Sequence, residues 1–110
     1  MADPIETPAP AKSTHEPLRE VVQMLLDELR QGVGERDKRR QVEEWLRALA
    51  EKYPDFPIAE GLRDYYLAEA ARLRSEFEAV KDLGEKLNLG RSIESFLDRA
   101  ADAERRIADR

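Results

Sequence analysis

The stretch that decides the fold runs from Ile58 to Leu87 and reads IAEGLRDYYLAEAARLRSEFEAVKDLGEKL. Its apolar side chains alternate steps of four and three residues, which places them on one face of a helix. The members of this seam are Ile58, Leu62, Tyr66, Ala70, Leu73, Phe77, Val80, Gly84 and Leu87. A heptad-like seam packs against neighbouring helices at a shallow angle. The sequence therefore predicts one long helix from about Pro57 to Leu87, with Gly84 as the point where it can bend.

Two shorter helices are expected before this stretch. Thr14 is a suitable N-cap and Gly32 a suitable C-cap for a first helix over residues 14–31, whose apolar stripe includes Val22 and Leu29. A second helix is expected over residues 35–53. It must stop there because the two prolines of the next turn cannot both lie inside one helix.

A fourth helix is expected after the long one. Asn88, Leu89 and Gly90 form a stop signal, and Ser92 is a suitable cap for a last helix that reaches about Asp109. No segment alternates β-branched and polar residues, and no Asn-Gly or Asp-Gly hairpin dipeptide occurs. The sequence thus predicts an all-α protein, a small bundle of three to four helices with one long helix.

The first thirteen residues differ in character from the rest. They contain Pro4, Pro8 and Pro10, and Ile5 is their only large apolar residue after Met1. Such a segment cannot offset its ordering entropy by burial. We therefore expect a disordered Pro-rich tail over residues 1–13 and a helical domain over 14–110. The alternative is that a short peptide around Ile5 docks on a partner.

Composition excludes several classes of protein. Charged residues make up 39% of the 110-residue chain, against about 25% in ordinary globular proteins, so the core must be thin. The net charge of −5 disfavours nucleic acid and anionic membranes as partners. The chain has no cysteine and no apolar run that could cross a bilayer, so we expect a cytoplasmic protein without disulfides.

Residues for catalysis or metal binding are scarce. His15 is the only histidine, there is no cysteine, and no Glu-x-x-His pair occurs. The glycines at positions 32 and 34 lack the third glycine and the preceding strand of a dinucleotide-binding fingerprint. We therefore expect no enzymatic activity, no cofactor and no metal.

Aromatic residues provide the best functional lead. Tyr65 and Tyr66 are adjacent on a helix, so we expect one of them to point away from the core, and the same conflict holds for Trp45 and Leu46. Exposed aromatic residues often anchor protein interfaces, although a wide apolar stripe can absorb both members of such a pair. The predicted partner-binding residues are Trp45, Tyr53, Phe56, Tyr65, Tyr66 and Leu67.

A second lead is the basic start of the second helix. The candidate phosphate-binding residues are Arg36, Lys38, Arg39, Arg40 and Arg47. Acidic residues are interleaved with them, and Glu35–Arg39 and Glu43–Arg47 have the spacing of helix-stabilising ion pairs. We therefore expect a protein-interaction module, an adaptor, docking or assembly subunit that binds a protein partner or forms a homo-oligomer. The alternative is a nucleic-acid-binding regulator or a helical subunit of a nucleoprotein assembly.

Overall fold

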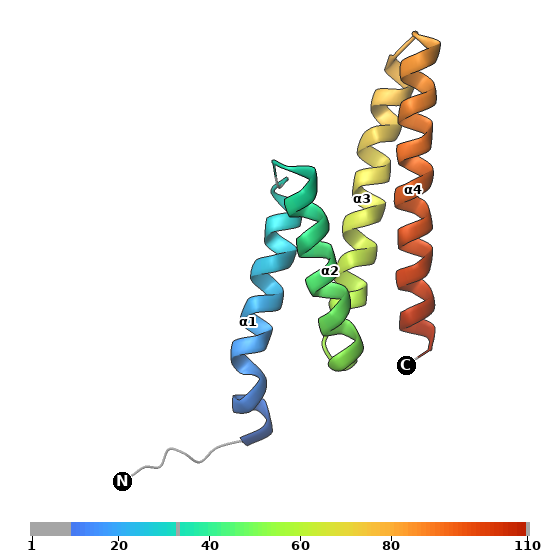
Figure 1. Ribbon diagram of the computed structural model, residues 1–110. Coiled ribbons are helices and arrows are strands. Elements are labelled where there is room, and N and C mark those ends of the chain that lie inside the picture. The colour runs from blue at the N-terminus through green and yellow to red at the C-terminus, as the bar shows by residue number, and fades with distance from the viewer. Residues whose placement is uncertain (1–9, 33, 110) are drawn as a thin grey trace. The chain divides into compact units, whose positions relative to one another are not determined.

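The computed structural model describes residues 10–32 and 34–109. These residues form four helices and no strand (Figure 1): α1 (Pro10–Arg30), α2 (Arg36–Lys52), α3 (Ile58–Ala79) and α4 (Leu83–Ala108). The all-α prediction is confirmed. None of the helices in the described part is long and apolar enough to cross a membrane.

The chain divides into two compact units whose boundary falls inside α2, between Val42 and Glu43. In the first unit, Val22, Leu26 and Leu29 of α1 are buried, as the predicted stripe requires. Helix α1 ends where a glycine was expected to end it, because Gly32 has a φ of 80°. The amide of Gly32 donates a hydrogen bond to the Leu29 carbonyl oxygen (3.1 Å).

The start of α1 differs from the prediction. The helix begins at Pro10 rather than at Thr14, so Pro17 lies inside it. Residues 1–9 of the predicted tail, and the side chains of Thr14 and His15, lie outside the described residues.

The second unit contains the end of α2 and the pair α3–α4, which pack closely against each other. The two helices run antiparallel, with the turn between them at one end (Figure 1). The buried side chains that line their contact include Leu62, Tyr66, Ala70 and Leu73 of α3 and Ile93, Phe96, Ala100 and Ala103 of α4. Leu46 of α2 and Ile58 of α3 are 0% exposed, and each such burial stabilises the fold by about 2 kcal/mol.

The turn between α2 and α3 lies where the two prolines predicted it. Helix α2 ends at Lys52 and α3 begins at Ile58. Within the turn, the rings of Tyr53 and Phe56 stack with their centroids 5.3 Å apart, and Phe56 is buried. This ring contact lies between the end of α2 and the start of α3.

The long helix predicted over residues 57–87 is wrong. Helix α3 ends at Ala79, Val80 is extended with a ψ of 139°, and a new helix starts at Leu83. The reason is an N-cap at Asp82, whose carboxylate accepts a hydrogen bond from the Glu85 amide (2.9 Å). Lys86 of the new helix also donates to the Phe77 carbonyl oxygen at the end of α3, which satisfies a group that the helix leaves free.

The predicted stop at residues 88–90 and the cap at Ser92 are also wrong, because α4 runs through both. Ile93 and Phe96 are buried against α3 just beyond the expected stop. Packing of this face outweighs the weak helix propensity of Asn88 and Gly90.

Candidate functional site

A pocket of about 250 Å³ lies in the second unit between the end of α2, α3 and α4. We call it the arginine pocket. It is lined by Arg47, Ala50, Ala59, Leu62, Tyr66, Asp98, Arg99, Asp102, Ala103 and Arg106. The lining thus combines three guanidinium groups and two carboxylates with alanine, leucine and tyrosine side chains.

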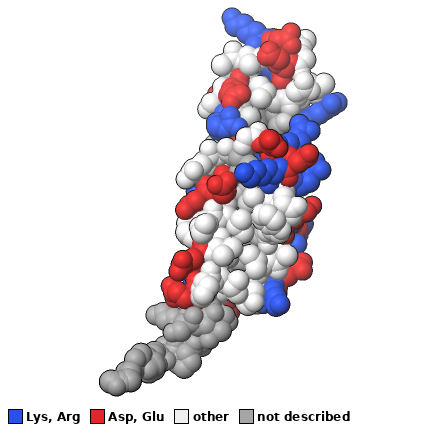
Figure 2. All heavy atoms as spheres, turned by 60° about the vertical axis from the view of Figure 1, so that its left-hand side comes forward, with Lys and Arg blue, Asp and Glu red and all other residues white. Residues whose placement is uncertain are grey.

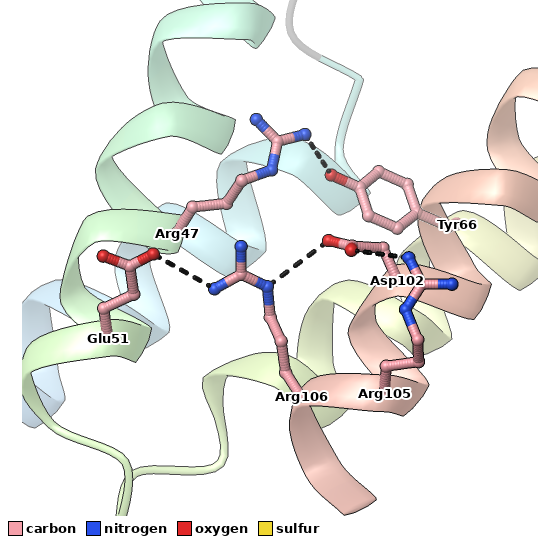
Figure 3. A network of polar contacts seen from close by, with 6 residues as sticks. All are labelled: Arg47, Glu51, Tyr66, Asp102, Arg105 and Arg106. Atoms are coloured by element: carbon pink, nitrogen blue, oxygen red, sulfur yellow. Dashed lines mark hydrogen bonds and ion pairs between the residues drawn. The ribbon is translucent and has the colours of Figure 1, made fainter. Parts of the chain in front are cut away.

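Figure 3 shows how two arginines of this pocket, Arg47 and Arg106, are held. Arg47 of α2 donates to the Tyr66 hydroxyl oxygen (3.2 Å). Arg106 of α4 bridges two carboxylates, Asp102 at 3.3 Å and Glu51 at 3.5 Å. Arg105 donates to the other oxygen of Asp102 (3.0 Å). These contacts tie α2 to both α3 and α4.

A buried acid completes the cluster. Glu43 is 3% exposed, and Arg99 of α4 lies 3.5 Å from its carboxylate. The guanidinium of Arg99 also lies over the Phe96 ring, 5.4 Å from its centroid, and 6.0 Å from that of Tyr66. The buried charge of Glu43 is thus compensated by a cation that is itself held by aromatic rings.

Two groups in the pocket have shifted pKa values. Burial raises the pKa of Tyr66 well above its ordinary value, and the nearby Glu43 carboxylate adds to the increase, while Arg47 opposes it. Burial also acts to raise the pKa of Asp102, but hydrogen bonds from Arg105 and Arg106 outweigh it and lower that pKa. At neutral pH Tyr66 is therefore a neutral phenol and Asp102 a carboxylate.

The arginine pocket is built to hold helices together. Arg47, Arg99 and Arg106 each already bind an acidic or phenolic oxygen of the same chain. The carboxylates of Glu43, Glu51 and Asp102 neutralise the charges of Arg99 and Arg106, whereas the neutral phenol of Tyr66 leaves the charge of Arg47 in place. Among the described residues, no group of three His, Asp or Glu side chains is arranged to hold a metal ion.

A second concave feature lies on α4, at the end of the α3–α4 pair that carries their connecting turn. This open depression of about 820 Å³ is called the α4 groove. It is lined by Phe77, Leu83, Lys86, Leu87, Gly90, Arg91, Glu94, Ser95, Asp98 and Arg99. Leu83 is 82% and Leu87 is 55% exposed, although both are large apolar side chains.

The structure separates the residues that were predicted to bind a partner. Trp45 and Leu67 are 52% and 45% exposed, whereas Phe56, Tyr65 and Tyr66 are buried. Tyr53 is partly exposed. Trp45 thus points outward and Leu46 inward, a choice that the sequence pattern left open. The buried residues belong to the core of the second unit and offer no surface to another molecule.

The expectation that either Tyr65 or Tyr66 points to solvent is wrong. Both pack against Phe96 of α4, with ring centroids 6.4 Å and 6.1 Å away, respectively. Two adjacent residues can share a core because α3 buries a wide face, and Phe96 is large enough to contact both rings.

The predicted basic residues are also divided. Arg36, Lys38 and Arg40 at the start of α2 are exposed and Arg39 is partly exposed, whereas Arg47 is hydrogen-bonded to Tyr66. The face in Figure 2 carries lysine and arginine intermixed with aspartate and glutamate, with no continuous basic area. Arg47 therefore differs from the other four candidates, because its guanidinium is held by a side chain of α3.

Sequence reasoning missed the α4 groove because it placed Leu87 at the end of a long helix and left Leu83 outside every stripe. The signal that could have found it is the sequence Asp82-Leu-Gly-Glu85, which has the form of a helix start. A helix starting there continues into the fourth helix and places Leu83 and Leu87 together on one face. No model of a known protein family matches the chain, and neither a curated protein nor a solved structure matches it significantly.

Proposed function

We propose that this chain is a non-enzymatic protein-interaction module, an adaptor or assembly subunit that binds another protein surface through the α4 groove. The observation that supports this function is the exposure of Leu83 and Leu87 beside Phe77. Single exposed apolar residues are common on monomers. Here two leucines lie four residues apart on one helix face and line one depression, so a partner can cover both at once.

The architecture of the second unit supports the same function. Two paired helices bury only the faces that they turn toward each other. Near the turn between α3 and α4, Leu83 and Leu87 lie on the remaining surface of α4. A partner that covers them removes apolar surface from water, which favours association.

Nucleic-acid binding is the competing proposal. It depends on the exposed cations at the start of α2, of which Arg36 and Arg40 are examples. It predicts retention of labelled DNA or RNA at low salt, with a loss on raising the salt concentration. The double substitution Arg39→Ala with Arg40→Ala would then weaken the binding. If no nucleic acid is retained at low salt, this alternative is excluded.

The interaction function can be tested with three tagged forms of the full chain. They are the wild type, Leu83→Ser with Leu87→Ser, and Trp45→Ala with Leu67→Ser. Both double variants replace exposed side chains, so circular dichroism should show all three folded. Quantitative mass spectrometry then compares what each form retains from the source cell extract, including untagged copies of the chain itself.

The proposal predicts that at least one protein is retained by the wild type and lost from the Leu83→Ser, Leu87→Ser variant. Retention that is lost only from the Trp45→Ala, Leu67→Ser variant would keep the interaction function but assign it to the surface around α2 and α3. If no retained protein depends on either pair, the proposed function is wrong.

A further inference from the structure

Helix α4 carries two lines of apolar side chains. The inner line is buried or partly exposed, and it consists of Leu89, Ile93, Phe96, Ala100, Ala103 and Ile107. A second line, which we call the outer seam, runs beside it along the helix. Its members are Leu83, Leu87, Gly90, Glu94, Leu97, Ala101, Glu104 and Ala108. Both lines advance by alternating steps of four and three residues, which is the spacing of helices that pack along their length.

The outer seam is apolar although it is exposed. Leu83, Leu87 and Leu97 are 82%, 55% and 40% exposed, and they are the three large apolar side chains that α4 leaves exposed. All three lie on the outer seam. The first half of the seam lines the α4 groove, whereas Leu97 lies beyond the groove. The apolar surface of α4 is therefore a line along the helix and not only a local depression.

The next line around α4 is polar. It advances by the same steps of three and four residues, and its members are Asn88, Arg91, Ser95, Asp98 and Asp102. The leucines are thus confined to one line. A line of leucines at heptad spacing matches the face of another helix, which can cover all of them at once.

The dimensions of the outer seam suit such a contact. Helix α4 has 26 residues, which corresponds to a length of about 40 Å. Small residues alternate with the leucines along the seam, since Gly90, Ala101 and Ala108 belong to it. The distance between two packed helices depends on the side chains at their contact, so small residues let a second helix approach closely.

Two acids interrupt the outer seam, and they differ in how their charges are compensated. The Glu104 carboxylate lies 3.0 Å from the guanidinium of Arg63 of α3. Glu94 belongs to none of the ten ion pairs in the described part of the chain, and neither does Arg91, three residues before it. Covering an unpaired carboxylate costs free energy unless a cation meets it. A helix that covers Glu94 must therefore supply that cation.

We infer that the outer seam of α4 binds an amphipathic helix of another protein, whose apolar line carries one lysine or arginine opposite Glu94. The inference rests on the proposed interaction function and names the kind of partner. Leucines lie on both sides of Glu94, with Leu87 before it and Leu97 after it. A single polar layer within an apolar contact fixes the register of two helices. A contact made by one pair of helices is small, so the complex should dissociate at micromolar concentrations.

The probe for this inference is a synthetic helical peptide of about four heptads, with leucine along its apolar line and lysine at the central position of that line. A control peptide has the same composition, but its central lysine is exchanged with a glutamate from the opposite face. General attraction to a chain of net charge −5 then contributes equally to both peptides. Fluorescence anisotropy of a trace of labelled peptide is measured while the full chain is added up to high micromolar concentration.

The wild-type chain should bind the lysine peptide with a micromolar dissociation constant. It should bind the control peptide at least about tenfold more weakly, because two carboxylates then oppose each other. The variant Glu94→Lys should reverse this preference. Leu97→Ser should weaken binding of the lysine peptide at least about tenfold, because a leucine of the contact is lost. Met24→Ser replaces a side chain of the first unit that is 66% exposed, and it should leave binding unchanged.

The inference is wrong if the chain binds neither peptide, if it binds both equally, or if Leu97→Ser has no effect. Sedimentation equilibrium of the full chain alone supplies a further outcome. A dimer that Leu97→Ser abolishes would make a second copy the occupant of the outer seam, which also overturns the inference. In each case the proposed function survives if a protein from the extract is retained by the wild type and lost from the Leu83→Ser, Leu87→Ser variant. The two proposals can therefore fail separately.

Discussion

At the scale of single residues, Glu43 is the most informative side chain of the second unit. It is the buried charged residue of the described chain, and its carboxylate lies 3.5 Å from Arg99 and close enough to Tyr66 to raise the pKa of the phenol. A buried charge costs free energy unless it is paired. The position thus joins α2 to α4 through one polar contact inside an otherwise apolar core.

Replacing Glu43 should therefore have a larger effect than replacing its neighbour. We expect Glu43→Ala to lower the free energy of unfolding by about 1–3 kcal/mol, because Arg99 loses its partner and the buried site is left unfilled. Glu44 is exposed, so Glu44→Ala should change it by less than about 0.5 kcal/mol. Urea denaturation followed by circular dichroism measures both. Equal effects would show that the Glu43–Arg99 contact does not stabilise the fold.

The sequence predicted only in part which aromatic side chains are buried and which are exposed. The adjacency of Trp45 and Leu46 predicted that one of them points outward, without saying which, and Trp45 is the exposed one. The same reasoning failed for Tyr65 and Tyr66, because both are buried. Whether both fit depends on Phe96, which is thirty residues from Tyr66 in the sequence and meets it only in the folded chain.

At the scale of elements, the break between α3 and α4 determines the shape of the second unit. The periodicity of the apolar residues continues across the break, from Phe77 and Val80 to Leu87. Periodicity reports which face is apolar and not whether the helix is continuous. Asp82 indicates where the helix is interrupted. Its side chain caps backbone amides that are free only at the start of a helix, so a new helix begins after it.

This cap can be tested by a matched pair of substitutions. Asp82→Ala removes the acceptor for the Glu85 amide and should lower the free energy of unfolding by about 1 kcal/mol. Asp82→Asn retains a side-chain oxygen at the same place, so most of that stability should remain. Thermal and urea unfolding of the two variants give the comparison. If both lose stability to the same extent, the cap at residue 82 does not stabilise α4.

At the scale of the whole molecule, the stability of the fold should depend on alkaline pH through Tyr66. Its pKa is raised in the folded protein, first by burial and then by Glu43. The unfolded chain releases this proton near the ordinary tyrosine pKa of about 10, whereas the folded chain retains it. Deprotonation therefore favours the unfolded state, and the contribution of Tyr66 is lost as the pH rises.

We expect the free energy of unfolding to fall as the pH rises above about 10, and to fall less steeply in Tyr66→Phe than in the wild type. Phenylalanine keeps the ring but has no proton to release. Urea denaturation at a series of pH values gives the two slopes. Lysine titration contributes equally to both proteins, so the difference between them isolates Tyr66. Identical slopes would contradict the burial of the Tyr66 hydroxyl.

The large-scale properties were the easiest to predict. Helical class and the turn after Lys52 follow from local periodicity and proline chemistry, which act over a few residues. The division of the chain inside α2, by contrast, depends on contacts between distant segments. No local sequence pattern around Val42 and Glu43 predicts this boundary.

Because the boundary between the two units lies inside α2, a truncation at either end of that helix removes buried residues from one unit. A boundary drawn at the turn before α2 would deprive the upstream product of Val42, and one drawn after Lys52 would take Leu46 and Glu43 from the downstream product. Each of these products would lack a side chain that is buried in the intact chain. Either truncation should therefore give a product that unfolds more readily than the same unit does within the intact polypeptide.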